Sequence, residues 1–364
     1  MNIKFTYYSI KVDRWIMKRR TQEIRKLIMM KIDDAGKASP NEVAKVFGIS
    51  RQAVFKNIKE LLASGAIEKR ESKAHMYRLK PLQDSYLTIL VGPGTEENKI
   101  WNESIAPLLT NLKSNVREIC HYGFTEMFNN VIDHSQASKT SVGVKVDALV
   151  VRISIQDYGI GIWRKLQQAF NLDDPRHALL ELTKGKLTTD PTRHTGEGIF
   201  FASRMFDKFL LASDKLKFCL VQEGEEWFFD VEEDDAGPGT NVIMTLYLDS
   251  EKTPREVFDK FTADFDDFGF TKTQLSVQLA KYEGDHLVSR SQAKRILNRL
   301  DKFKEVHLDF RDVTDIGQAF ADEIFRVFKN DHPTIRIIPV NLRPQVEKMI
   351  RRVGTPENQT ELPI

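Results

Sequence analysis

The spacing of apolar residues changes along the chain and divides it into three parts. In residues 17–80, apolar positions recur at helical spacing in three short segments, and two short alternating segments follow. Residues 100–250 mix helical and alternating spacing, and residues 272–354 alternate strands with helices. We therefore expect an α/β and α+β multidomain protein, with enough chain for each domain to have its own core.

The first part begins with two predicted helices. Residues 23–32 have helical apolar spacing, and a second helix is expected from Asn41 to Phe47. Ser39 is the predicted N-cap of this second helix, Pro40 its first residue, and Glu42 the partner that closes a capping box.

A third helix is predicted from Ser50 to Leu62, between Gly48 and Gly65. The segments 67–70 and 76–79 then flank a turn. Three helices followed by a hairpin resemble a winged helix-turn-helix, which implies that the Ser50–Leu62 helix is a recognition helix.

Charge favours DNA as the partner of this part. Residues 17–80 contain 16 Lys and Arg against seven Asp and Glu, although the whole chain has a net charge of only +2. Val54, Ile58 and Leu61 are expected to face the core. The polar side chains left for duplex DNA are Arg51, Gln52, Lys56, Asn57 and Lys59, with Arg51, Gln52 and Lys56 as the candidate contacts. The alternative is a winged helix that binds protein and has merely solvated charges.

The second part contains four short polar and glycine-rich motifs. Glu126, Asn130 and His134 recur every four residues and therefore share one face of a helix. A carboxylate, a carboxamide and an imidazole on one face suit a hydrated metal better than a core. The motifs are Glu126-Met127-Phe128-Asn129-Asn130, Asp157-Tyr158-Gly159-Ile160-Gly161, His194-Thr195-Gly196-Glu197-Gly198 and Gly237-Pro238-Gly239-Thr240.

Two of these motifs are expected to approach a ligand through their backbone. Asp157 ends a strand predicted over residues 151–155, and the glycines after it allow a sharp turn close to a flat ligand. Gly196 and Gly198 precede an apolar helix over residues 199–206, whose free amides are suited to phosphates.

Together these motifs resemble the N, G1 and G2 boxes and the closing G-T strand of GHKL (Bergerat-fold) ATPases of the histidine-kinase and anti-sigma-factor type, over residues 100–250. The resemblance implies a Bergerat α/β sandwich that binds ATP and Mg²⁺. It makes Asn130 the Mg²⁺ ligand and Asp157 the acceptor of the adenine amine. Glu126 is either the catalytic base or a carboxylate without chemistry. The other implied nucleotide contacts are Gly159, Gly161, Thr195, Gly196, Gly198 and Thr240.

The polar stretch 184–193 lies where this family has its ATP lid. Its Lys184, Lys186 and Arg193, and the adjacent His194, are either phosphate contacts or solvated side chains.

The third part contains a run from Leu308 to Ala319 that resembles the strand-loop-helix signature of STAS domains, over residues 272–354. Gln318 or Ala319 stands where anti-sigma-factor antagonists have a phosphorylated serine, so phosphorylation there is not expected. Thr314 is interpreted as a turn residue. Pro339 is expected to end the preceding strand.

Composition excludes other classes. With 41% hydrophobic residues and no apolar run near 18, we expect no membrane span. Cys120 and Cys219 are expected to be buried free thiols, and a cytoplasmic protein is expected because free thiols fit a reducing compartment. Residues 1–16 lack the apolar core of a secretory signal and stay unassigned, either as an extra strand or as sequence upstream of a start at Met17.

Three hypotheses for function follow. The first is a DNA-binding regulator in which a GHKL nucleotide switch, with or without slow hydrolysis, is coupled to a STAS-like docking domain for a protein partner. The second is an anti-sigma-type serine protein kinase that acts on a separate partner. The third is a nucleotide-binding scaffold without turnover. A homodimer is compatible with each, and the DNA site and the triggering signal stay open.

Overall fold

The computed structural model describes residues 3–70, 76–172, 174–188, 195–221, 225–230, 237–262, 269–281 and 286–354. The chain forms two compact units, which are described separately. The first comprises residues 1–86, 143–152 and 246–249, and the second comprises residues 87–142, 153–245 and 250–364.

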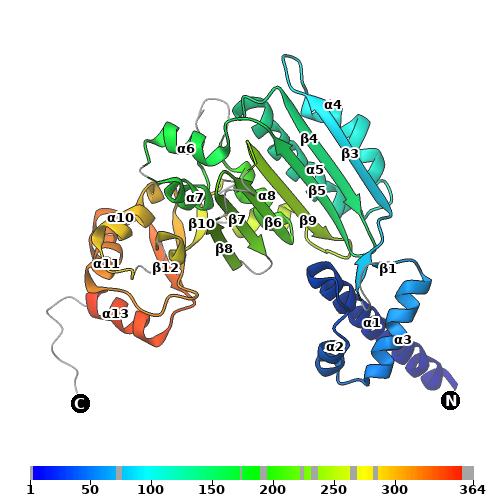
Figure 1. Cartoon of the computed structure of the whole chain (residues 1–364). Helices are drawn as coiled ribbons and strands as arrows, with labels where there is room; N and C mark the ends of the chain where they lie inside the picture. Colours follow the sequence, from blue (N-terminus) through cyan, green and yellow to red (C-terminus); the bar gives the residue numbers. More distant parts are fainter. Residues whose placement is uncertain are drawn as a thin grey trace, which may run out of the picture. The chain divides into compact units, whose positions relative to one another are not determined.

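The first unit is built from three helices and a two-stranded antiparallel sheet (Figure 1). Its elements are α1 (Ile3–Ala35), α2 (Pro40–Phe47), α3 (Arg51–Ala63), β1 (Ile67–Lys69) and β2 (Tyr77–Leu79). Their apolar faces form one core with Leu149, Val150 and Tyr247, which belong to the same unit. The predicted order of three helices and a hairpin is confirmed.

One open assignment in this unit is resolved, and one local prediction was wrong. Residues 3–16, which the sequence left unassigned, belong to the long helix α1 and do not form the extra strand that was one alternative. Ser39 adopts a left-handed conformation with φ 44° and makes no side-chain cap hydrogen bond. Glu42 instead pairs with Lys31 of α1 at 2.6 Å, so a tertiary ion pair replaces the predicted capping box. Ser50, in contrast, caps α3 by accepting from the Ala53 amide at 3.2 Å.

The second unit contains most of a seven-stranded sheet in the order β3-β4-β5-β9-β6-β7-β8. The strands are β3 (Gln83–Leu90), β4 (Lys139–Val146), β5 (Val150–Asp157), β6 (Lys208–Ser213), β7 (Leu216–Val221), β8 (Glu225–Asp230) and β9 (Thr240–Tyr247). The edge strand β3 begins before residue 100, ahead of the predicted start of this part.

Helices α5 (Ser114–His134) and α8 (Gly198–Met205) cover one face of this sheet (Figure 1). Phe124 and Phe128 of α5 are buried and stack on each other. They form an apolar face of this helix, and its polar residues lie on a different face. The remaining helical segments are α4 (Glu97–Ile100), η1 (Trp101–Ile105), η2 (Ala106–Leu109), α6 (Ile162–Phe170), α7 (Pro175–Lys184) and α9 (Pro254–Lys260).

The C-terminal part of this unit is a three-stranded parallel sheet in the order β10-β11-β12. Pro339 lies inside β12 instead of ending it, which is tolerated because β12 is an edge strand and one of its sides needs no hydrogen-bond donor. The elements are β10 (Lys272–Ser276), η4 (Val277–Ala280), α10 (Arg290–Leu297), η5 (Leu300–Lys302), β11 (Glu305–Asp309), α11 (Gln318–Asp322), η6 (Glu323–Phe328), α12 (Lys329–Asp331), β12 (Arg336–Val340) and α13 (Pro344–Gly354).

Candidate functional site

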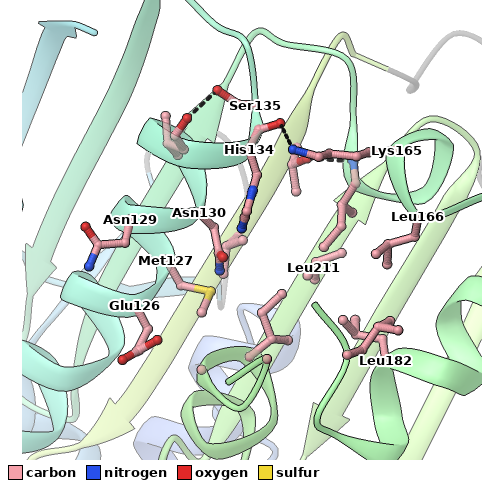
Figure 2. A pocket seen from close by; sticks show the side chains of 18 of the residues that line it. Glu126, Met127, Asn129, Asn130, His134, Ser135, Lys165, Leu166, Leu182 and Leu211 are labelled. Carbon is pink, nitrogen blue, oxygen red and sulfur yellow. Dashed lines mark hydrogen bonds between the residues drawn. The ribbon is translucent and has the colours of Figure 1, made fainter. Parts of the chain in front are cut away.

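One cavity of about 310 Å³ brings together the four motifs, although they are separated along the chain. Glu126, Asn130 and His134 lie on one face of α5 and all line it, as their four-residue spacing predicts (Figure 2). The other predicted nucleotide contacts that line the cavity are Asp157, Gly161, Thr195, Gly196, Gly198 and Thr240.

Asp157 lies at the C-terminal end of β5 and lines the cavity. Its side chain is only 4% exposed, and Oδ1 accepts a hydrogen bond from the Gly159 amide at 2.9 Å. The backbone and hydroxyl of Thr240 also donate to this carboxylate. Burial raises the pKa of Asp157, and these hydrogen bonds oppose the rise. The result is a buried acceptor fixed by two of the motifs.

Thr240 also positions the next helix. Its Oγ1 accepts the Ile162 amide at 3.0 Å, at the start of α6. Gly159 does not line the cavity, but a Cβ there would overlap the backbone carbonyl of Ser135. Glycine is therefore required for the loop after β5 to pass the end of α5.

The N-terminus of α8 closes the cavity against α5. A Cβ at Gly198 would overlap the Glu126 carboxylate, so glycine lets this carboxylate approach the first turn of α8. Glu197 is half-buried, and burial raises its pKa against the opposing effects of Lys186 and of a hydrogen bond with Thr195. Burial, followed by the Glu126 and Glu197 carboxylates, raises the pKa of the nearby Tyr122 hydroxyl.

Lys165 of α6 lines the same cavity and was missed in the sequence analysis. Its Nζ donates to the carbonyl of His134, the last residue of α5, at 2.8 Å (Figure 2). Lys165 lies four residues after Gly161, which also lines the cavity. Because residues four apart share one face of a helix, this spacing was a signal in the sequence that could have identified Lys165.

Lys184, for which the sequence left a phosphate contact and a solvated side chain open, does not line the cavity. It is 1% exposed, and its Nζ donates to Glu181 Oε1 at 2.6 Å. It also donates to the carbonyls of Arg295 at 2.8 Å and Asn298 at 2.9 Å, at the end of α10. This lysine therefore connects α7 to the C-terminal sheet domain. The sequence alone did not reveal this role, because two of the three acceptors are more than a hundred residues away along the chain.

Lys186 also points to the C-terminal domain. Its Nζ donates to the Lys302 carbonyl at 3.1 Å and lies 4.9 Å from the centre of the Phe303 ring, and it is not among the residues that line the cavity. Arg193 and His194 lie outside the described residues.

On α3 the three candidate DNA contacts, Arg51, Gln52 and Lys56, are all exposed. Asn57 was also expected to face DNA, but its Oδ1 accepts from Arg25 Nε of α1 at 3.2 Å. Asn57 therefore packs the helices together and is not available to a groove.

In the C-terminal domain, Gln318 and Ala319 are exposed at the start of α11. The Thr314 hydroxyl donates to Asp315 Oδ1 at 2.9 Å, as expected for a residue of the preceding loop.

Of the predicted free thiols, Cys120 is buried and Cys219 is only half-buried.

Two family models match the chain. The MarR family matches residues 26–75, and a family described as STAS-like domain of unknown function (DUF4325) matches residues 292–347. The N-terminal domain is therefore a MarR-type winged helix, and the C-terminal domain is STAS-like. Neither match covers residues 76–291, which contain the cavity.

No curated protein matches the chain. Among solved structures, an IcIR transcriptional regulator from Alicyclobacillus acidocaldarius is 10% identical and covers 66% of this chain and 94% of its own, with a TM-score of 0.20. That score is too low to support an argument. In the part of the chain that the structure describes, no helix combines the length and apolar character needed to cross a bilayer.

Proposed function

We propose that this protein is a DNA-binding regulator with a nucleotide switch. In sequence order it has a MarR-type winged helix, a GHKL-type domain that binds ATP and Mg²⁺, and a STAS-like domain. The observation that supports it is the cavity into which Asn130, Asp157, Gly161, Gly198 and Thr240 converge from four separate motifs. A cavity with a few convergent polar groups is the usual form of a ligand site.

The residues present suit such a ligand. Asp157 is a buried acceptor that fits the 6-amino group of adenine. The amides at the start of α8 fit phosphate oxygens. Among the described residues no cluster of three or more His, Cys, Asp or Glu could hold a metal by itself. Asn130, assisted by Glu126, would therefore hold Mg²⁺ together with water and phosphate oxygens, which is the usual way that Mg²⁺ is bound. The metal would neutralise phosphate charge.

Glu126 would orient water toward the terminal phosphate, or remain a carboxylate without chemistry. Its carboxylate lies against Gly198, beside the amides proposed for phosphate. The winged helix would bind duplex DNA through Arg51, Gln52 and Lys56, which are exposed on α3.

The test is calorimetric titration of the whole chain with ATP, with and without Mg²⁺. Asn130→Ala should remove the dependence on Mg²⁺. Asp157→Asn should weaken binding by roughly 10- to 100-fold and reduce the preference for adenine over guanine, because a charged acceptor is lost from a buried site. Unchanged binding by both variants would refute the assignment of the cavity.

An assay with γ-labelled ATP distinguishes hydrolysis, transfer of the phosphate to a protein, and binding without turnover. Phosphate release that falls by about 10²–10⁴-fold in Glu126→Ala supports hydrolysis with Glu126 as base. Label transferred to a separate protein instead supports the serine kinase alternative. Binding without either product supports a switch or scaffold.

A further inference from the structure

The described lining of the cavity has an unusual charge balance for a site that takes a polyphosphate. It includes three carboxylates, from Glu126, Asp157 and Glu197, but Lys165 is the only Lys or Arg among the described lining residues. A triphosphate in this space would be repelled by the carboxylates. The proposed Mg²⁺ would offset part of this repulsion, and the ammonium group of Lys165 is the side-chain cation in the described lining that could offset more of it.

The geometry of Lys165 leaves it capacity for a ligand. Its side chain is half-buried and extends from α6 toward the end of α5, where Nζ donates to the His134 carbonyl at 2.8 Å (Figure 2). An ammonium has three N–H donors, and one of them donates a hydrogen bond to a described residue, the His134 carbonyl. Asn130 lies one turn before His134 on the same face of α5.

The lysines expected from the sequence do not take this role. Lys184 is fully engaged with Glu181 and with carbonyls of the STAS-like domain, and Lys186 donates to Lys302. Neither lines the cavity.

From these observations we infer that Lys165 binds the phosphate chain of the nucleotide, with the His134 carbonyl holding the ammonium group in place at the end of α5. This inference rests on the proposed function, because it names the residue that recognises the phosphates of the same nucleotide. A purely structural role, in which Lys165 only satisfies the C-terminal carbonyl of α5, is the competing explanation.

The two roles are separated by comparing adenosine, ADP and ATP as ligands of the full chain in calorimetry. Lys165→Ala and Lys165→Met should weaken ATP and ADP by about 10- to 100-fold, because a charge-assisted hydrogen bond is lost, while adenosine binds as in the wild type. Lys165→Arg should recover most of the ATP affinity. The matched control is Arg164→Ala, which removes an equal charge from the neighbouring residue of α6 that pairs with Asp214 outside the cavity lining.

Each outcome has a definite meaning. Equal losses for adenosine and ATP in both neutral variants would assign Lys165 to the structure of the α5 end and overturn the inference. The inference is also overturned if both variants bind ATP like the wild type. In both of these cases the proposed function stands, because the wild type still binds the nucleotide. If the wild type binds neither adenosine nor ATP, the proposed function fails and the inference fails with it.

Discussion

Lys165 and Lys184 occupy neighbouring short helices of the second unit but have opposite surroundings. Lys165 of α6 is half-buried beside a cavity and has one described acceptor, the His134 carbonyl. Lys184 of α7 is 1% exposed and has three acceptors, from Glu181, Arg295 and Asn298. All three N–H donors of Lys184 are thus used within the protein. A lysine with every donor satisfied serves the fold, whereas one with spare donors at a cavity is available to a ligand.

The surroundings of Lys184 join the cavity wall to the STAS-like domain. Thr273 Oγ1 of β10 donates to the Lys184 carbonyl at 2.7 Å, and Arg299 donates to the Lys186 carbonyl at 2.7 Å. The next residue, Leu187, lines the cavity and donates its amide to the Gly196 carbonyl at 3.2 Å. A continuous hydrogen-bonded segment therefore runs from the STAS-like domain to the predicted nucleotide contacts.

The largest expected effect is on stability, from Lys184→Met. Removing one member of a buried ion pair costs about 3–5 kcal/mol, because the other charge is left uncompensated. The lower half of that range is expected here, since Arg299 Nε lies 3.8 Å from Glu181 Oε2 and still offsets the carboxylate. The free energy of unfolding from urea titration measures the change.

The control for this prediction is the double variant Lys184→Met with Glu181→Leu. Replacing both charges by apolar groups should recover most of the loss. If Lys184→Met alone unfolds like the wild type, the contrast between the two lysines is wrong.

A smaller effect is expected on DNA binding by the winged helix. It tests the same distinction between side chains available to a ligand and side chains that serve the fold. Arg51 is exposed on α3, so Arg51→Ala should weaken DNA binding by about 1–3 kcal/mol if it contacts a base, with little change in stability. Fluorescence anisotropy against salt concentration measures it, since phosphate contacts also make binding salt-dependent.

Asn57→Ala is the matched control on the same helix. Because Asn57 accepts from Arg25 and donates to the Ala53 carbonyl at 3.0 Å, its loss should lower stability more than DNA affinity. The reverse pattern in the two variants would contradict the placement of these side chains.

The third effect is the dependence of ATP binding on pH. Burial raises the pKa of Asp157 above its ordinary value of 3.8, so its carboxylate should protonate at a higher pH than an exposed Asp. ATP affinity should then fall as pH decreases through that raised pKa, by up to about tenfold per pH unit, because protonation removes the charged acceptor. Asp157→Asn should lose this contribution and retain the pH dependence of the nucleotide and of Glu197, whose pKa is also raised by burial. Identical pH profiles for both proteins would exclude Asp157 as the titrating acceptor.

The smallest effect is expected for Arg164→Ala. Arg164 pairs with Asp214 at 2.9 Å, but its side chain is 59% exposed. Exposed ion pairs contribute about 0–1 kcal/mol, so urea unfolding should change by less than about 1 kcal/mol. A loss as large as that of Lys184→Met would show that exposure does not separate the two kinds of ion pair.

Local signals predicted much of the fold. Alternation identified β5, and the helical spacing of Glu126, Asn130 and His134 correctly placed them on one face of α5. Gly48 correctly marked the C-terminus of α2, and Ser50 correctly marked the N-terminus of α3. The capping box predicted for Ser39 was wrong, because Glu42, its expected partner, pairs with Lys31 of another helix.

The sequence by itself determined the type and approximate place of many elements, and which polar residues share a face, because these depend on residues within one or two helical turns or along one strand. Only the tertiary structure decided which lysine serves the fold and which faces the cavity. The reason is physical: the function of an ammonium group depends on the acceptors around it. The Arg295 and Asn298 carbonyls that hold Lys184 lie 111 and 114 residues away along the chain, and the carbonyl that holds Lys165 lies 31 residues away.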